Sequence, residues 1–179
     1  MSLSDDFLNN YGSFMKNHAI LIPNQTTAGV GTFKFAAQGQ HAVLLQNTGS
    51  INGIYVKPQP NHNNVYTLPA EQEAPYYMFT DQMTGCQWMA YGPSRHDLTV
   101  EHNNFINNPN QYAQRLQHIQ AQNHAYCWHI SAGVNNIAQG SYNAQDGLNI
   151  LGEYTPTNGW RFFVRDRAGA NQGELYGPF

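Results

Sequence analysis

Runs of apolar and polar residues recur along most of the chain in patterns that predict short β-strands. Residues 29–35 alternate with the period of two that a half-buried strand requires, whereas residues 41–46 form the continuous apolar run of a buried strand. Turn formers separate such runs, and the Pro- and Asn-rich stretch 58–64 is expected to be a loop. Strands are therefore predicted over residues 29–35, 41–46, 51–57, 65–68, 76–80, 86–91, 98–102, 125–130, 148–154 and 160–165.

Two stretches change to the helical period. Residues 5–18 carry apolar side chains at helical intervals behind Ser4, which can serve as the N-cap. A second helix is expected to open at Asn108-Pro109 and to continue to about Gln122. Many strands against two helices predict an α+β fold with a β-sandwich-like core of mixed or antiparallel sheets, flanked by a few helices. With 179 residues the chain is expected to form one globular domain, 1–179.

Composition narrows the function classes. Charged residues make up 11% of the chain and the net charge is −3, so no basic field is present to bind nucleic acid. The N-terminus lacks the basic region and apolar run of a cleavable signal peptide, and no stretch approaches the ~20 apolar residues of a membrane helix. We therefore expect a soluble protein, and export into a target-cell cytoplasm by a dedicated system stays open.

The stretch from Thr80 to Phe105 holds the candidate chemistry. Two strand-like runs flank the turn formers Gly-Pro-Ser-Arg-His-Asp, which predicts a hairpin. Counting pairs outward from the middle of that turn brings Cys86 opposite His102, or one residue off. Directly opposed residues have Cβ atoms about 4.5–5.5 Å apart, but a one-residue slip would place the two side chains on opposite faces of the sheet.

A cysteine beside a histidine is the arrangement of a thiol nucleophile and its base. The imidazole raises the thiolate fraction and then protonates a leaving amine. Gly85 lets the backbone turn sharply and lets a substrate approach, so that amide N–H groups near Cys86 can face a developing oxyanion. The alternative is that Cys86 is a small apolar side chain in the core, which is the commonest state of a free cysteine.

The spacing of Thr80, Thr84-Gly85-Cys86 and His102 resembles that of the cysteine–histidine glutamine deamidases. This group includes the cytotoxic necrotising factor catalytic domain, the Burkholderia lethal factor toxin and the chemotaxis receptor deamidase. The resemblance covers residues 80–105, and the chain has Met83-Thr84 where several members have Leu-Ser. It implies that Cys86 is the nucleophile, that His102 is the base and acid, and that Thr80 orients His102 through a backbone or side-chain oxygen.

The resemblance also implies a reaction. Cys86 would attack the carboxamide carbon of a glutamine in a target protein, ammonia would leave, and water would hydrolyse the thioester, with no metal or organic cofactor. An amine in place of water would make the protein a transglutaminase, and attack on a peptide bond would make it a cysteine protease. A non-catalytic β-rich binding or immunity module is the remaining class, and it predicts a buried Cys86 far from any histidine.

The remaining histidine, cysteine and arginine candidates are interpreted as structural or surface residues. His96 is a rival base, but its turn position would hold it less firmly than a strand does. Cys127 lies between two aromatic residues and is expected to be buried; with only two cysteines, a disulfide framework or a zinc site is not predicted. The arginines that alternate near the end of the last strand are expected to form its exposed face, namely Arg161, Arg165 and Arg167.

Overall fold

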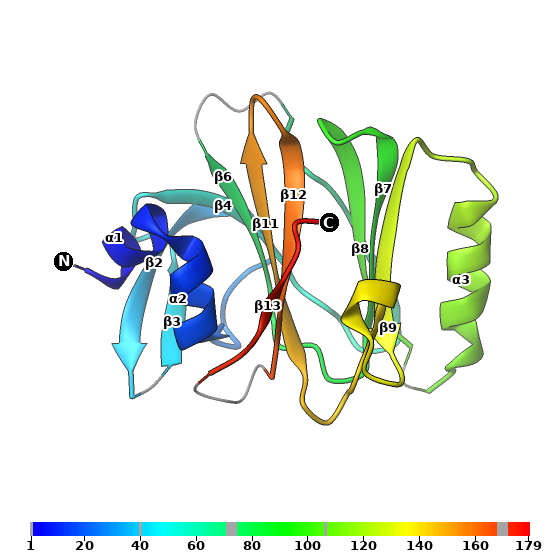
Figure 1. Ribbon diagram of the computed structural model, residues 1–179, viewed down its shortest axis with the longest axis horizontal. Coiled ribbons are helices and arrows are strands. Elements are labelled where there is room, and N and C mark those ends of the chain that lie inside the picture. Colours follow the sequence, from blue (N-terminus) through cyan, green and yellow to red (C-terminus); the bar gives the residue numbers. More distant parts are fainter. Residues whose placement is uncertain (1, 40, 71–74, 106, 168–171) are drawn as a thin grey trace.

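The computed structural model describes residues 2–39, 41–70, 75–105, 107–167 and 172–179. Within these residues thirteen strands form two mixed sheets, and three α-helices pack on them, which confirms the predicted α+β class (Figure 1). The larger sheet contains, in spatial order, β1 (Ala19–Leu21), β3 (His41–Gln46), β2 (Gly29–Gln38), β4 (Ile51–Val56), β6 (Tyr76–Thr80), β11 (Leu148–Thr155), β12 (Gly159–Asp166) and β13 (Leu175–Tyr176). The smaller sheet contains β10 (Ser141–Tyr142), β9 (Tyr126–Ala132), β7 (Gln87–Ser94), β8 (Asp97–Asn104) and β5 (His62–Thr67).

Two apolar cores hold the layers together. The inner core lies between the two sheets, where Trp88 of the smaller sheet contacts Phe162 of the larger one with ring centroids 4.7 Å apart. The outer core lies between the larger sheet and two short helices, α1 (Leu3–Asn9) and α2 (Tyr11–Asn17), whose Phe7 is fully buried. Figure 1 shows these helices against the larger sheet and α3 (Asn110–Gln120) on the far side of the smaller sheet. The order is therefore helices, sheet, sheet, helix.

The first helical stretch is broken, so the prediction of one helix over residues 5–18 was wrong. Asn10 ends α1 through its N–H, which donates to the Asp6 carbonyl, and its side-chain oxygen accepts from Ser13 N–H to begin α2. The first N-cap is Ser2, which forms a capping box with Asp5, and not Ser4. Asparagine suits this junction because its short amide bonds to nearby backbone groups that a continuous helix would use.

Other predictions differ at the ends of elements or in burial. β5 begins at His62, inside the stretch predicted as a loop, whereas β6 has the predicted bounds. Arg165 is not on an exposed face: it is fully buried, and its guanidinium donates to backbone carbonyls, including that of Met15 in α2. A long side chain with several donors can satisfy carbonyls at a helix end, which an alternating pattern does not reveal. None of the described helices has the length and apolar composition to cross a membrane.

Candidate active site

The hairpin that carries the candidate residues forms as predicted, but its turn lies further along the chain. Ser94 pairs with Asp97, so Arg95-His96 make the turn, and the register shifts by a bulge between Tyr91 and Ser94. At Gly92 an added Cβ would lie 2.1 Å from the Asp97 carbonyl oxygen, so only glycine fits this close approach of the two strands.

The resulting register places Trp88, and not Cys86, directly opposite His102. Cys86 lies two positions before Trp88, just ahead of the first residue of β7. The prediction that Cys86 would be opposite His102 or one residue off was therefore wrong: the offset is two positions, because the turn lies at Arg95-His96 and not at the middle of the predicted turn segment. An offset of two positions keeps both residues on one face of the sheet, because side chains alternate with a period of two.

That face is the inner one, which packs against the larger sheet. Cys86 belongs to the inner core with Trp88, and His102 alternates with Val100, which belongs to the same core. Cys86 itself lies just outside the paired residues, and within a ladder an offset of two positions corresponds to about 7–8 Å. Both residues are buried, Cys86 at 8% exposure and His102 at 0%. Among the described residues no hydrogen bond joins the Cys86 thiol to the ring, so proton transfer requires a side-chain adjustment.

The imidazole of His102 bridges the two sheets. Its Nδ1 lies 3.3 Å from the carbonyl oxygen of Val56, the last residue of β4. A carbonyl can only accept, so Nδ1 carries the proton and Nε2 presents its lone pair. Nε2 is buried and has no hydrogen-bond partner among the residues that the structure describes. Burial lowers the pKa of His102 to about 4, because the low-dielectric interior disfavours the imidazolium, so the ring is neutral at pH 7.

Thr80 does not orient His102. Its hydroxyl accepts from Ile150 N–H at 2.9 Å and lies 3.4 Å from the Ile150 carbonyl, so it is used between β6 and β11. The oxygen that holds the histidine comes instead from Val56, which pairs with Thr80 in the parallel ladder of β4 and β6. The expected contact is thus made by the neighbouring strand, and Thr80 supports that strand from inside the sheet.

Cys86 is a neutral thiol in this environment. Burial, together with the nearby carboxylate of Asp81, which repels the thiolate, raises its pKa to about 11. Asp81 is itself held by the Tyr55 hydroxyl, at 3.3 Å. The site therefore holds a protonated thiol and an unprotonated imidazole nitrogen on one face, the pair from which a proton can pass as the thiol attacks.

Gly85 has the conformation that the sequence predicted for it. Its φ is +141°, a region that residues with a Cβ rarely adopt, and apart from its two chain neighbours no atom of the described residues lies within 4 Å of where a Cβ would be. The backbone beside Cys86 is therefore both sharply turned and open on this side.

The remaining candidates lie elsewhere. His96 is exposed in the turn at the other end of the hairpin, where its ring contacts the Tyr154 hydroxyl at 3.2 Å. Cys127 is exposed, not buried as predicted, and both cysteines are free thiols. Glu101 points to the outer face, where it forms an ion pair with Arg115 of α3. Glu101 and His96 are therefore each engaged away from His102.

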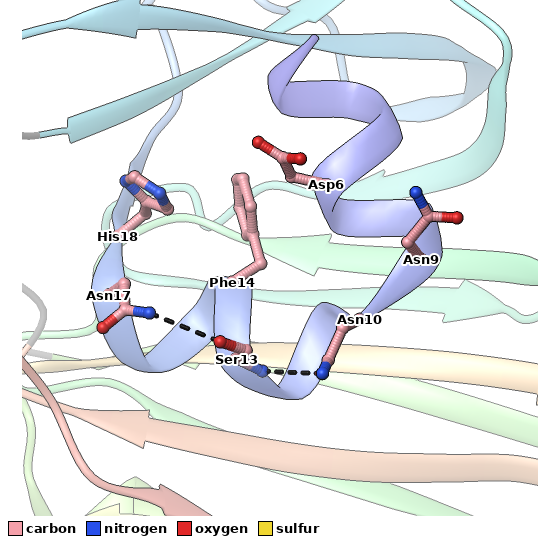
Figure 2. A pocket seen from close by; sticks show the side chains of 7 residues that line it. All are labelled: Asp6, Asn9, Asn10, Ser13, Phe14, Asn17 and His18. Carbon is pink, nitrogen blue, oxygen red and sulfur yellow. Dashed lines mark hydrogen bonds between the residues drawn. The ribbon is translucent and has the colours of Figure 1, made fainter. Parts of the chain in front are cut away.

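A separate cavity of about 310 Å³ lies between α1 and α2 (Figure 2). Figure 2 shows Asp6 and His18 on either side of the Phe14 ring, with asparagines around the rest of the wall. These helices cover the face of the larger sheet that is turned away from Cys86, and none of the predicted site residues lines this cavity. No group of three or more His, Cys, Asp or Glu side chains suited to a metal occurs in the described part of the chain.

Comparison with solved structures identifies a similar fold. The crystal structure of the C-terminal domain of CNFy from Yersinia pseudotuberculosis aligns with a TM-score of 0.53 and 9% sequence identity. The alignment covers 83% of this chain and 70% of that domain. The likeness shows a distant relationship of fold. No protein-family model matches the chain, and no curated protein sequence matches it.

Proposed function

We propose that this protein is a protein-glutamine deamidase that uses Cys86 as nucleophile and His102 as base and acid. The observation that carries the proposal is the state of His102: a buried, neutral ring whose Nδ1–H donates to Val56, with an unpartnered Nε2 on the face that carries the cysteine. A base that is oriented by a third group and shares a face with a nucleophile is consistent with the arrangement expected of covalent catalysis.

The first step is attack by the Cys86 sulfur on the side-chain amide carbon of a glutamine. The thiol proton moves to Nε2 of His102 as the C–S bond forms. A separate thiolate and imidazolium would cost on the order of 10 kcal/mol here, given pKa values of about 11 and about 4, so transfer and attack occur together. The amide carbonyl becomes an oxyanion, and Val56 holds the imidazolium through its carbonyl.

Collapse of the oxyanion breaks the C–N bond, and His102 gives its proton to the leaving ammonia. Water then attacks the thioester, His102 takes a proton from it, and glutamate is released as the thiol is restored. The product carries a negative charge where the partner protein had a neutral amide, which is sufficient to alter a regulatory surface. The substrate is proposed to be a glutamine in a target protein.

Two independent lines support this chemistry over the alternatives. The spacing of Gly85-Cys86 and His102 resembles the family that includes the cytotoxic necrotising factor catalytic domain, and the fold is similar to the C-terminal domain of CNFy. The binding-module class predicted Cys86 buried and far from any histidine. Cys86 is buried, but it stands two positions before Trp88, the residue directly opposite His102, on the same inner face.

The proposal is tested on extracts of animal cells and of bacteria. Each extract is treated with the wild-type protein, with C86S, with H102Q, or with C127S as a matched control that removes the exposed thiol. Peptide mapping is expected to find Gln-to-Glu conversion with the wild-type protein and C127S only. Conversion that survives in C86S, or none in either extract, would overturn the proposal. Peptide cleavage or amine incorporation that depends on Cys86 would assign the same dyad to a protease or a transglutaminase.

A further inference from the structure

Two tyrosine hydroxyls hold the backbone on which Cys86 stands. The Tyr142 hydroxyl accepts from Gly85 N–H and donates to the Cys86 carbonyl, each at 2.9 Å. The Tyr112 hydroxyl accepts from Phe105 N–H and donates to the Gly85 carbonyl, also at 2.9 Å in both contacts. Each hydroxyl thus uses its single proton and one lone pair, so both contacts of each tyrosine form at once.

These contacts come from two elements outside the hairpin. Tyr142 belongs to the edge strand β10 and is 1% exposed, whereas Tyr112 belongs to the first turn of α3 and is partly buried. The glycine between them has φ of +141°, a conformation that no side chain of its own stabilises. The two tyrosines therefore supply from outside the restraint that Gly85 lacks.

One backbone polar group of Gly85-Cys86, the N–H of Cys86, is left to bind a substrate atom. Gly85 N–H, Gly85 C=O and Cys86 C=O are all bonded to tyrosine hydroxyls. Among the described residues no hydrogen bond uses the amide N–H of Cys86. The N–H of Cys86 belongs to the residue whose sulfur attacks, so it is a donor that can reach the oxyanion formed on the attacked carbon.

We propose that Tyr112 and Tyr142 are positioning residues that fix the Gly85-Cys86 backbone so that the Cys86 N–H donates to the oxyanion. The proposal rests on the proposed function in one respect, that Cys86 adds to a carbonyl carbon. It does not require that the carbonyl belong to glutamine. Loss of either hydroxyl is expected to impair carbonyl addition while leaving reactions of the thiol that form no oxyanion little changed.

Two small probes separate these effects. With p-nitrophenyl acetate the sulfur adds to the ester carbonyl through an oxyanion; the C–S bond forms, the C–O bond breaks, p-nitrophenolate leaves with the electron pair, and the thiol proton passes to His102. With iodoacetamide the sulfur displaces iodide at a saturated carbon, and no oxyanion forms. The ratio of the acylation rate to the alkylation rate at Cys86 therefore reports on the oxyanion donor and not on the thiol pKa.

The test measures this ratio by intact mass in a C127S background for Y142F, Y112F and the control Y76F. Tyr76 is a matched control because its hydroxyl also donates to a backbone carbonyl, that of Gly53 at 2.9 Å, at the other end of β6 from the site. Y142F and Y112F are each expected to lower the ratio at least about tenfold, below the ~10²–10³ of removing an oxyanion donor outright, and Y76F to leave it unchanged.

Several results would overturn the proposal. An unchanged ratio in both site variants, an equal fall in Y76F, or no acylation of Cys86 in the C127S parent would each do so. Because the two hydroxyls come from different elements, Y112F still decides the matter if Y142F does not fold. Failure of the proposed function is distinguishable: in that case the ratio falls as expected, but no protein glutamine is converted in the cell extracts.

Discussion

The burial of His102 makes a quantitative prediction about stability and pH. Its pKa is lowered to about 4 in the folded protein and is 6.5 when unfolded, so the unfolded chain binds the proton first as pH falls. Stability from the neutral ring is fully present above pH 6.5 and is lost as pH falls towards 4. Over that whole window the loss amounts to about 3 kcal/mol, and at pH 5 it is roughly 2 kcal/mol.

The perturbation that isolates this effect is H102Q, whose amide cannot titrate but can donate to the Val56 carbonyl. Urea unfolding of the wild-type protein and of H102Q at pH 7.5, 6, 5 and 4.5 gives the free energy of unfolding of each. The difference between the two proteins is expected to move by roughly 2 kcal/mol between pH 7.5 and pH 5 in the direction that weakens the wild type. His129, whose pKa is also lowered by burial, is present in both proteins and cancels. A difference that stays constant over this range would refute the buried, neutral histidine.

Three further predictions concern the surroundings of the site. R115M leaves the carboxylate of Glu101 buried without its cation and is expected to lower the free energy of unfolding by roughly 2 kcal/mol. This is below the ~3–5 kcal/mol of fully buried pairs because Arg115 is 26% exposed. Urea unfolding measures the loss, and the double variant with E101Q should recover most of it. D81N removes the charge that raises the pKa of Cys86, so the pH profile of alkylation by iodoacetamide in C127S should move to lower pH, and a profile that stays or rises would contradict this. G85A places a Cβ at φ +141° and is expected to lower stability by about 1–3 kcal/mol while slowing acylation of Cys86; an unchanged free energy of unfolding would show that Gly85 is not strained.

Local pattern predicted the elements well where the chain's own neighbours decide the structure. Strand β6 and the hairpin of β11 and β12 follow from alternation and from turn formers beside them. The break at Asn10 was missed because a polar residue within a helical pattern is normally interpreted as a surface position of a continuous helix. Only the hydrogen bonds of its side chain and N–H show that it ends one helix and begins the next.

The candidate site was predicted in part for the same reason. Cys86 stands just ahead of β7 and His102 lies in β8, so a short stretch of sequence carries both residues to the same face of the smaller sheet. The offset was missed because Pro93 lies in a bulge within the strand, and not in the turn. Residue type alone does not distinguish a bulge within a strand from a turn between strands.

The groups that support the dyad come from remote parts of the chain. The carbonyl of Val56 lies at His102 because β4 pairs with β6 in the larger sheet, and no local sequence pattern predicts that strand order. Neither Tyr112 nor Tyr142 was predicted as a site residue, since the partner of a hydroxyl is a backbone group that any sequence carries. Long-range pairing, rather than residue type, decides these contacts.

The isotope content of a converted glutamine reports whether Cys86 forms a thioester that water hydrolyses. The cell extracts are treated with the wild-type protein or with C86S in water enriched in ¹⁸O, and glutamine-containing peptides are mapped. If Cys86 forms a thioester that water resolves, the amide nitrogen is replaced by one solvent oxygen, and the site gains about 3 Da in place of about 1 Da in ordinary water. The account predicts this gain at specific glutamines with the wild-type protein and none with C86S. Equal labelling by both proteins, or no labelled glutamine at all, would contradict it.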